Sequence, residues 1–257
     1  LVIPQFCLRF GDVDNIGITG HNVGFVMMGQ HAFVKPKYYD REKYFREIYH
    51  WIDKGLGINR DELIFHEDAW AGGGNFGSCM EFFSRGLELG NQVYMEYEQT
   101  STGSRELDIK VLDMGEGQER AAWFTQGTST NYDATFPDVM KKLYKITDIK
   151  VDNELMKKFL PYSSYLNLDE VEDINKSWKF VANNVNETVE SLKEKILPLA
   201  ALYSIGEHSR ALLVAVNDGG LPSNTGGGYN LRMLYRRMLN FIDKYQFPLD
   251  VNEIVNW

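Results

Sequence analysis

Apolar and polar residues alternate along several short segments in the first half of the chain, a pattern typical of β-strands with one buried face. Strands are predicted at Leu1–Phe10, Phe25–Val34, Glu62–Glu67, Gln92–Glu98 and Glu106–Asp113. Between them, Tyr44, Ile48 and Ile52 recur at helical spacing and predict an amphipathic helix over Tyr39–Leu56. A further helix is expected from about Ala121. Strands mixed with helices and Gly-rich loops indicate an α+β domain.

From Phe136 onward the pattern becomes helical. Candidate helices cover Asp138–Lys145, Asp152–Phe159, Leu168–Asn184, Thr188–Ile205, Glu207–Val216 and Tyr229–Tyr245. Pro137 is a natural break before the first of them, so the sequence predicts an α+β domain over residues 1–136 and an all-α domain over 137–257.

Composition narrows the functional classes. Of the 257 residues, 44% are hydrophobic and 25% are charged, as in a globular protein. The formal net charge of -9 excludes a general basic surface for nucleic acid, so any RNA contact must come from a local patch. Cys7 and Cys79 stand far apart and are expected as reduced thiols of a cytoplasmic protein.

Neither a membrane segment nor a secretion signal is expected. No apolar run approaches the roughly 20 residues that span a bilayer. The chain begins Leu1-Val-Ile-Pro, without an initiator Met or a basic leader, which suggests that the natural start lies upstream.

The segment Asp113-Met-Gly-Glu-Gly-Gln-Glu-Arg120 follows a predicted strand and opens a predicted helix. Its glycines allow a ligand to approach the main chain, and an Arg at a strand–helix junction can bind a phosphate with two hydrogen bonds. The Asp113 carboxylate could hold an ammonium group.

A second Gly-rich run, Gly72-Gly-Gly-Asn-Phe-Gly77, matches the dinucleotide-binding pattern G-x-G-x-x-G. Its surroundings do not repeat strand–helix–strand, and no acidic residue ends a second strand at the required distance. A loop that borders a small-ligand pocket is the better interpretation. A dinucleotide-dependent oxidoreductase would reveal itself by binding NAD(H).

Several segments together resemble the class II aminoacyl-tRNA synthetases, and specifically the archaeal type of alanyl-tRNA synthetases. They are Gln5–Phe10, Asp14–Gly20, Met27–Phe33, His66–Gly77, Glu81–Met95 and Asp113–Arg120, in the order of that family. The resemblance implies a class II synthetase-like antiparallel sheet with helices, followed by an all-α domain. It also implies ATP and Mg²⁺ as cofactors.

The resemblance assigns roles to individual residues. Arg9 would orient the α-phosphate of ATP, and Arg120 would contact its phosphates as the second catalytic Arg. ATP would also contact Met27, Met28 and Gly117. Alanine would be bound by Trp70, Asn91, Asp113 and Gly115, with Trp70 as a wall of its pocket. Taken alone, Trp70 could equally be a core aromatic residue, and Asp113 could be a turn former. No metal-ligating cluster is predicted.

The second domain contains Asn217–Arg237, a Gly-rich turn followed by a helix with basic residues at i, i+4 and i+5. Such a cluster on an acidic protein can bind phosphate, although a basic face paired to acids elsewhere is the common alternative. The segment resembles the acceptor-stem recognition region of the same synthetases. Asn224, Arg232, Arg236 and Arg237 are therefore expected to bind tRNA.

The match departs from the family at His21, Asn22 and Val26, where Arg, His and Glu are usual, and the first signature motif and an editing domain are absent. The expected function is activation of alanine with ATP and its transfer to the 3′ end of tRNA(Ala). A second polypeptide could supply the missing N-terminal part, as in one half of a split synthetase. The alternative is a non-catalytic synthetase-like module that binds tRNA. The sequence does not show the oligomeric state.

Overall fold

The computed structural model describes all 257 residues, and the chain forms two compact units that interleave along the sequence. We call Leu1–Phe6 with Val26–Thr125 the sheet unit, and Cys7–Phe25 with Gln126–Trp257 the helical unit. The sequence instead predicts a single boundary at Pro137. The units differ from that prediction mainly because the segment Cys7–Phe25, between the first two strands, belongs to the helical unit.

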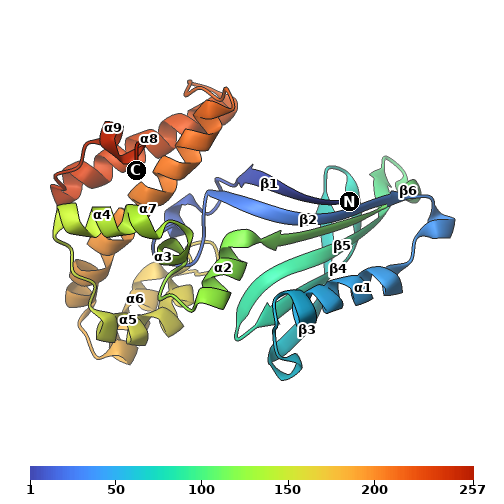
Figure 1. Cartoon of the computed structure of the whole chain (residues 1–257), viewed down its shortest axis with the longest axis horizontal. Coiled ribbons are helices and arrows are strands. Elements are labelled where there is room, and N and C mark those ends of the chain that lie inside the picture. Colours follow the sequence, from blue (N-terminus) through green and yellow to red (C-terminus); the bar gives the residue numbers. More distant parts are fainter. The chain divides into compact units, whose positions relative to one another are not determined.

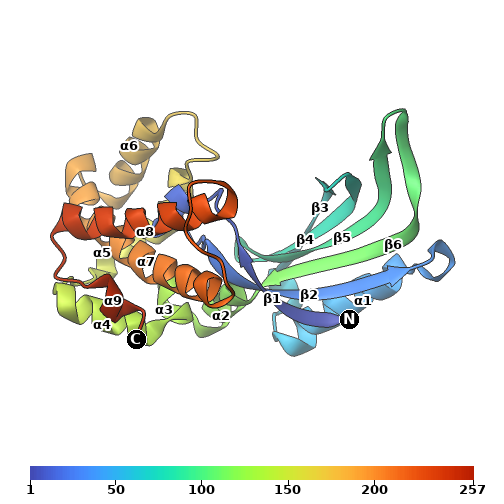
Figure 2. The same cartoon turned by 90° about the horizontal axis from the view of Figure 1, so that it is seen from above.

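The sheet unit is built on a six-stranded sheet with the order β1-β2-β6-β5-β4-β3 (Figures 1 and 2). The strands are β1 (Val2–Leu8), β2 (Gly24–Val34), β3 (Leu63–Gly72), β4 (Asn75–Ser84), β5 (Leu87–Thr100) and β6 (Gly103–Gly117). Four neighbouring pairs, β2–β6, β6–β5, β5–β4 and β4–β3, are antiparallel. The predicted antiparallel sheet is confirmed.

Helix α1 (Arg41–His50) covers one face of this sheet (Figure 1). It begins at Asp40, whose carboxylate accepts a hydrogen bond from the backbone N–H of Lys43 at 2.9 Å, and it continues into a π-helical turn, Trp51–Gly55. Residues of this helix and turn, with the inward side chains of the sheet, form two apolar clusters around Ile48, Ile52, Phe82, Leu89 and Met114 and around Tyr44, Tyr94 and Leu112. The sheet is therefore covered on this face.

Strand β4 was missed in the sequence, and the Gly-rich run that precedes it was interpreted as a loop. In the structure Gly73 and Gly74, with φ of 59° and 85°, form the turn of the β3–β4 hairpin. Strand β4 carries two register irregularities, between Phe76 and Gly77 and between Phe82 and Phe83, which interrupt the alternation that sequence analysis depends on. Because a strand follows the glycines instead of a helix, the run has no dinucleotide-binding context.

Short helices lead into the helical unit, and longer ones form its core. Helix α2 (Gln118–Gln126) is the last element of the sheet unit, which ends at Thr125. The helices of the helical unit are α3 (Asn131–Thr135), α4 (Pro137–Thr147), α5 (Asn153–Phe159), α6 (Ile174–Val185), α7 (Val189–Asn217), α8 (Gly226–Tyr245) and α9 (Val251–Ile254). Helices α7 and α8 lie side by side in both views (Figures 1 and 2). None of the helices combines the length and apolar character that a membrane crossing requires.

Helix α7 was predicted as two helices separated at Gly206, but it is continuous over 29 residues and contains Pro198. A Cβ at Gly206 would lie 3.0 Å from the Phe136 ring and 3.4 Å from the Leu143 side chain. The glycine thus permits close packing of α7 against its neighbours and does not end the helix. Buried residues along α7, including Leu192, form the centre of the apolar core of the unit.

Tyr132 at the start of α3 anchors the segment Cys7–Phe25 within the helical unit. Its hydroxyl accepts a hydrogen bond from the backbone N–H of Gly17 at 2.7 Å and lies 2.8 Å from the carbonyl oxygen of His21. Complete burial raises the pKa of Tyr132 far above its usual value, so the hydroxyl stays protonated. Gly17 adopts a φ of 88°, which a residue with a side chain rarely adopts.

Candidate active site

The sheet face opposite α1 carries the polar residues that the sequence singled out. Partners in register share a face, so His31, Asp113, Val93, Cys79 and Asp68 form one row across the strands. The row beside it contains Gly29, Gly115, Asn91, Glu81 and His66. The structure therefore brings Asp113, Asn91 and Gly115 together on one surface.

Three glycines form the centre of this surface, and a longer side chain lies over each of them. A Cβ built on Gly29 would be 2.2 Å from Nε2 of His31, and one on Gly115 would be 2.7 Å from Sδ of Met27. A Cβ on Gly117 would be 3.5 Å from Cγ of Arg120. The bare backbone allows Arg120 to extend along the sheet, and movement of a flexible side chain such as Met27 would open the backbone to a ligand.

Asp113 is held by a histidine that the sequence did not single out. Oδ1 of Asp113 lies 2.9 Å from Nδ1 of His31, its partner in register on β2. The Asp113 side chain is 38% exposed, whereas that of His31 is 13% exposed. The carboxylate is thus anchored on one side and open on the other, a geometry that suits an ammonium ligand.

Trp70 lies on the same face but at a distance from Asp113. Its register partner Gly77 is in the row next to Asp113, and β3 is three strands away from β6, or roughly 14 Å at the usual strand spacing. The ring packs over Gly72, where a Cβ would lie 2.4 Å away. The expected role of Trp70 as a pocket wall stays a prediction.

Arg120 lies in the first turn of α2, directly after β6. Its Nη1 donates to Oε2 of Glu88 at 2.8 Å and to the Glu88 carbonyl oxygen at 3.2 Å. About 30% of the side chain remains exposed. An Arg held by one carboxylate and directed along an open sheet face can exchange that partner for a phosphate.

The two methionines expected at the nucleotide lie on opposite faces. Met27 is paired with Gly117 and lies on the sheet face opposite α1. Met28 faces α1 and, with Trp51 and Glu116, lines a cavity of about 420 Å³. Burial raises the pKa of Glu116 to about 7, and the hydrogen bond that Trp51 Nε1 donates at 2.7 Å opposes this shift. Met27 therefore shares a face with Asp113, whereas Met28 lies on the opposite face and does not reach that surface.

Arg9 lies in the helical unit, just beyond β1. Its side chain is 69% exposed, and Nε forms an ion pair with Asp12 at 3.0 Å. Its backbone N–H donates to the carbonyl oxygen of Val23 at 2.8 Å. The guanidinium is thus accessible on a backbone that is firmly held.

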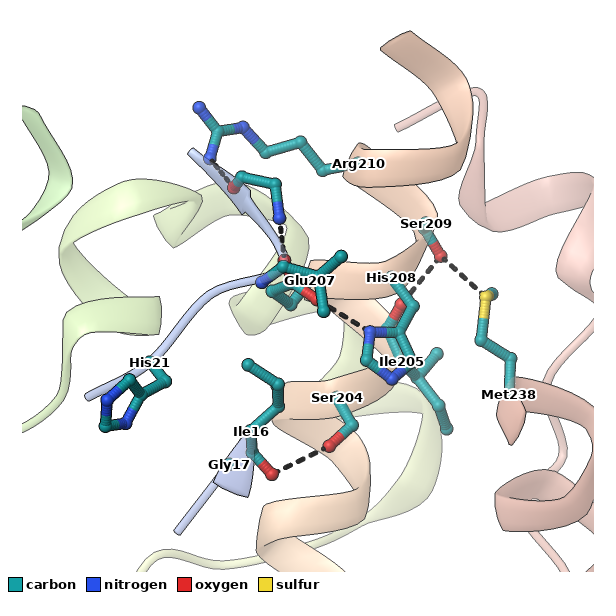
Figure 3. A network of polar contacts seen from close by, with 12 residues as sticks. Ile16, Gly17, His21, Ser204, Ile205, Glu207, His208, Ser209, Arg210 and Met238 are labelled. Atoms are coloured by element: carbon teal, nitrogen blue, oxygen red, sulfur yellow. Dashed lines mark hydrogen bonds and ion pairs between the residues drawn. The ribbon is translucent and has the colours of Figure 1, made fainter. Parts of the chain in front are cut away.

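Buried hydrogen bonds from α7 hold the backbone of Val23 and Gly24, at the end of the segment Cys7–Phe25 that also carries Arg9 (Figure 3). Oε1 of Glu207 accepts hydrogen bonds from the backbone N–H groups of Val23 at 2.8 Å and Gly24 at 2.7 Å. Oε2 lies 2.6 Å from Nδ1 of His208, and Nη1 of Arg210 donates to the Gly24 carbonyl oxygen at 3.1 Å. Glu207 and His208 are fully buried, so the carboxylate depends on these donors.

His21, Asn22 and Val26, where the sequence departs from the family pattern, differ in their local contacts and burial. His21 Nδ1 lies 2.6 Å from the Thr19 hydroxyl, and Asn22 is buried. The backbone N–H of Val26 donates to both carboxylate oxygens of Glu119, at 3.1 and 3.0 Å. Glu119 therefore supplies a carboxylate beside the position where the family usually has one.

In the predicted tRNA-binding segment, the Arg232 guanidinium contacts Oδ1 of Asn224 in the exposed turn before α8. Arg236, one turn after Arg232, is also exposed. Arg237 instead forms an ion pair with Asp14 at 2.6 Å and is only 26% exposed. Asn224 and Arg232 are thus in direct contact and Arg236 follows one turn later, whereas Arg237 already has a carboxylate partner.

No group of three or more His, Cys, Asp or Glu side chains is arranged to hold a metal ion. Mg²⁺ in nucleotide sites is commonly held by one or two carboxylates together with the phosphates. Glu88 beside Arg120 fits that requirement, so the residues present are compatible with Mg²⁺ that arrives with ATP. Cys7 and Cys79 are free thiols.

His31, Glu88 and Glu207 were missed in the sequence because each has a role only through a partner that is distant along the chain. His31 and Glu207 meet Asp113 and Val23 across 82 and 184 residues, and Glu88 is 32 residues from Arg120. The register of β2 on β6 would have identified His31, but alternation alone does not determine register.

The chain is similar to known proteins along its whole length. A family model described as "tRNA synthetases class II (A)" matches residues 1–257. The chain is 52% identical over 255 residues to the alanine--tRNA ligase of Methanocella arvoryzae, covering 98% of this chain and 29% of that protein. It is 40% identical to the alanine--tRNA ligase of Nitrosopumilus maritimus and 39% identical to that of Cenarchaeum symbiosum, covering 100% of this chain and 29% of each relative. The chain thus spans about 29% of the length of these curated relatives, and it belongs to the class II (A) family of tRNA synthetases.

Proposed function

We propose that this chain carries much of the active site of an alanine–tRNA ligase and the beginning of its acceptor-stem recognition region. The observation that carries the proposal is that Asp113, Asn91 and Gly115 lie in neighbouring rows on one face of the sheet, close to glycines that are covered only by the side chains of His31, Met27 and Arg120. The names of the similar proteins supply the amino acid, alanine.

In the first step of this reaction, a carboxylate oxygen of alanine attacks the α-phosphorus of ATP. A new O–P bond forms, the bond to the β-phosphate oxygen breaks, and pyrophosphate leaves. Asp113 and the Asn91 amide oxygen accept hydrogen bonds from the ammonium group, and Gly115 leaves room for the ligand beside the backbone. Arg120 stabilises the negative charge that the phosphates gain, and Mg²⁺ would supply further neutralisation there when bound with ATP.

Arg9 is proposed as the contact to the α-phosphate, and the family motif supports this role. The local structure adds that its guanidinium is exposed while its backbone is held by Val23. Met27 and Gly117 remain proposed ATP contacts. Trp70 remains a proposed wall of the amino-acid pocket.

In the second step, a ribose hydroxyl at the 3′ end of tRNA(Ala) attacks the activated carbonyl carbon and AMP leaves. Asn224, Arg232 and Arg236 are proposed to bind the acceptor stem, because an exposed amide beside two exposed guanidinium groups suits the shallow groove and phosphates of A-form RNA. Arg237 is proposed to support the helix through Asp14. The cytoplasm is the proposed location of this reaction.

The alternative is a non-catalytic module that binds tRNA. It is favoured by the departures at His21, Asn22 and Val26, which alter the usual ATP-binding residues. It is opposed by Glu119, which lies at the Val26 backbone, and by the open carboxylate of Asp113.

Alanine-dependent pyrophosphate exchange by the intact protein tests the proposal. We expect exchange with alanine and its loss in Asp113→Ala, because the ammonium would lose its charged partner. Exchange at the wild-type rate in that variant would remove Asp113 from the site. The absence of exchange with every amino acid, together with retained tRNA binding, would support the non-catalytic alternative.

A further inference from the structure

We propose that His31 is a positioning residue for the amino acid. Its Nδ1 orients Asp113 so that the second carboxylate oxygen faces the substrate ammonium. This inference rests on the proposed role of Asp113 in binding alanine.

Strand pairing holds His31 against Asp113. His31 and Asp113 are partners in register on β2 and β6, and Nδ1 lies 2.9 Å from Oδ1. The imidazole is mostly buried, whereas the carboxylate is the more exposed partner. A buried ring on a paired strand is a rigid support, and it restricts rotation of the carboxylate about its terminal bond.

The two ring nitrogens of His31 have different surroundings. A carboxylate oxygen can only accept, so Nδ1 must be the donor in this pair. Nε2 of His31 is buried and has no hydrogen-bond partner. The ring therefore holds the carboxylate through Nδ1 alone.

Gly29 lies beneath the imidazole ring of His31. A Cβ at Gly29 would lie 2.2 Å from Nε2 and 2.8 Å from Cε1 of His31. Any side chain at position 29 would push the imidazole away from the sheet and from Asp113. The absence of a side chain at Gly29 therefore leaves the space that the His31 ring occupies.

Positioning of this carboxylate matters because alanine offers few contacts. Its side chain is a methyl group, so recognition depends on the ammonium and carboxylate groups and on the size of the pocket. A carboxylate that can rotate must be ordered on binding, which weakens binding of the ammonium but not of ATP.

The test is pyrophosphate exchange by the intact protein, with KM measured separately for alanine and ATP. In His31→Leu, which removes the donor, we expect KM for alanine to rise about tenfold and KM for ATP to stay within about twofold, a tenfold loss being usual for one hydrogen bond to a charged group. In His31→Asn, whose amide nitrogen can replace Nδ1, we expect KM for alanine to recover to within about threefold of the wild-type value.

His66→Leu is the matched control. His66 also bonds a carboxylate, that of Glu81 at 3.0 Å, but its side chain is 62% exposed on the outer strand β3. Neither KM should change in this variant. Gly29→Ala keeps the histidine but displaces its ring, so it should also raise KM for alanine.

The inference is overturned if His31→Leu leaves KM for alanine unchanged, if it raises both KM values equally, or if His31→Asn behaves like His31→Leu. Should His31→Leu fail to fold, ¹⁵N NMR of the ring in the wild-type protein decides. A ring that carries a proton on Nδ1, hydrogen-bonded to Asp113, supports the inference, and a ring without a proton on Nδ1 contradicts it.

Asp113→Ala separates this inference from the function on which it rests. If that variant exchanges pyrophosphate like the wild type, the proposed role of Asp113 fails, and this inference fails with it. If Asp113→Ala loses exchange while His31→Leu keeps the wild-type KM for alanine, only the inference about His31 fails.

Discussion

Glu207 on α7 binds the backbone of Val23, 184 residues earlier in the chain, through a hydrogen bond of 2.8 Å from the Val23 N–H to Oε1. The carbonyl oxygen of the same Val23 accepts the backbone N–H of Arg9, also at 2.8 Å. A buried carboxylate in the helical core is therefore linked, through one peptide group on each side of Val23, to the residue proposed to contact the α-phosphate.

Glu207→Ala should destabilise the helical unit and weaken ATP binding. The substitution leaves two buried N–H groups without acceptors, and the expected loss is about 2–5 kcal/mol in the free energy of unfolding. Glu207→Gln retains one acceptor and should cost less. Denaturant unfolding measures the loss, and in the folded variants KM for ATP should rise more than KM for alanine. Glu194→Ala, an exposed change on the same helix, is the control. Equal unfolding free energies for Glu207→Ala and Glu194→Ala would contradict the argument.

Gly17→Ala should be among the most destabilising single methyl additions in the helical unit. Gly17 has a φ of 88°, and a Cβ there would lie 2.2 Å from the backbone oxygen of Ala200 in α7. Backbone strain and the steric clash act together, so we expect a loss of roughly 2–4 kcal/mol. Gly73→Ala, at a positive φ but in open space, should cost only the conformational strain. Thermal unfolding of both variants measures the difference in stability. A smaller loss of stability for Gly17→Ala than for Gly73→Ala would contradict the predicted clash with Ala200.

Glu116 should make the sheet unit less stable as the pH rises. Its pKa in the folded state is raised to about 7, mainly by burial, whereas its usual value is 4.5. The folded state then binds the proton more tightly than the unfolded state. The associated stability is fully present below pH 4.5 and is lost as the pH rises through about 7.

Glu116→Gln tests this sign because it removes the ionisation and can still accept the hydrogen bond from Trp51. At pH 8 the variant should be more stable than the wild type by roughly 3 kcal/mol or less, and at pH 4 the two should be similar. Urea unfolding at several pH values measures the difference. A wild-type advantage that grows above pH 7 would show that the carboxylate is stabilised in its charged form.

The two adjacent arginines of α8 should behave differently. Arg236→Ala should weaken binding of tRNA(Ala) and lower its salt dependence by about one unit of slope, because an exposed guanidinium would lose a phosphate. Arg237→Ala should instead lower stability by up to about 1 kcal/mol through loss of its ion pair with Asp14. Asp14→Ala should match Arg237→Ala in stability. Titration of tRNA at several salt concentrations separates the variants, and the reverse order of effects on binding would be evidence against this assignment.

The local sequence was sufficient for most of the secondary structure and for the family. Helix α1 and the π-helical turn that continues it follow from Tyr44, Ile48 and Ile52 at helical spacing, and the strand that leads to Asp113 follows from alternation. These signals are local, because a residue and its neighbours in the same helix or strand face the same environment. For the same reason, irregular or tightly packed elements were misjudged: strand β4 with its bulges was missed, and α7 was divided at Gly206.

The grouping of residues into a site depended on the tertiary structure. Strand register decided that His31 lies against Asp113 and that Met28 faces away from it, since a shift of one residue exchanges the two faces of a strand. Packing of α7 decided that Glu207 binds the Val23 backbone and that the segment carrying Arg9 belongs to the helical unit. Such contacts join positions far apart along the chain, and no periodicity in the sequence records them, because they arise only when separately formed elements pack together.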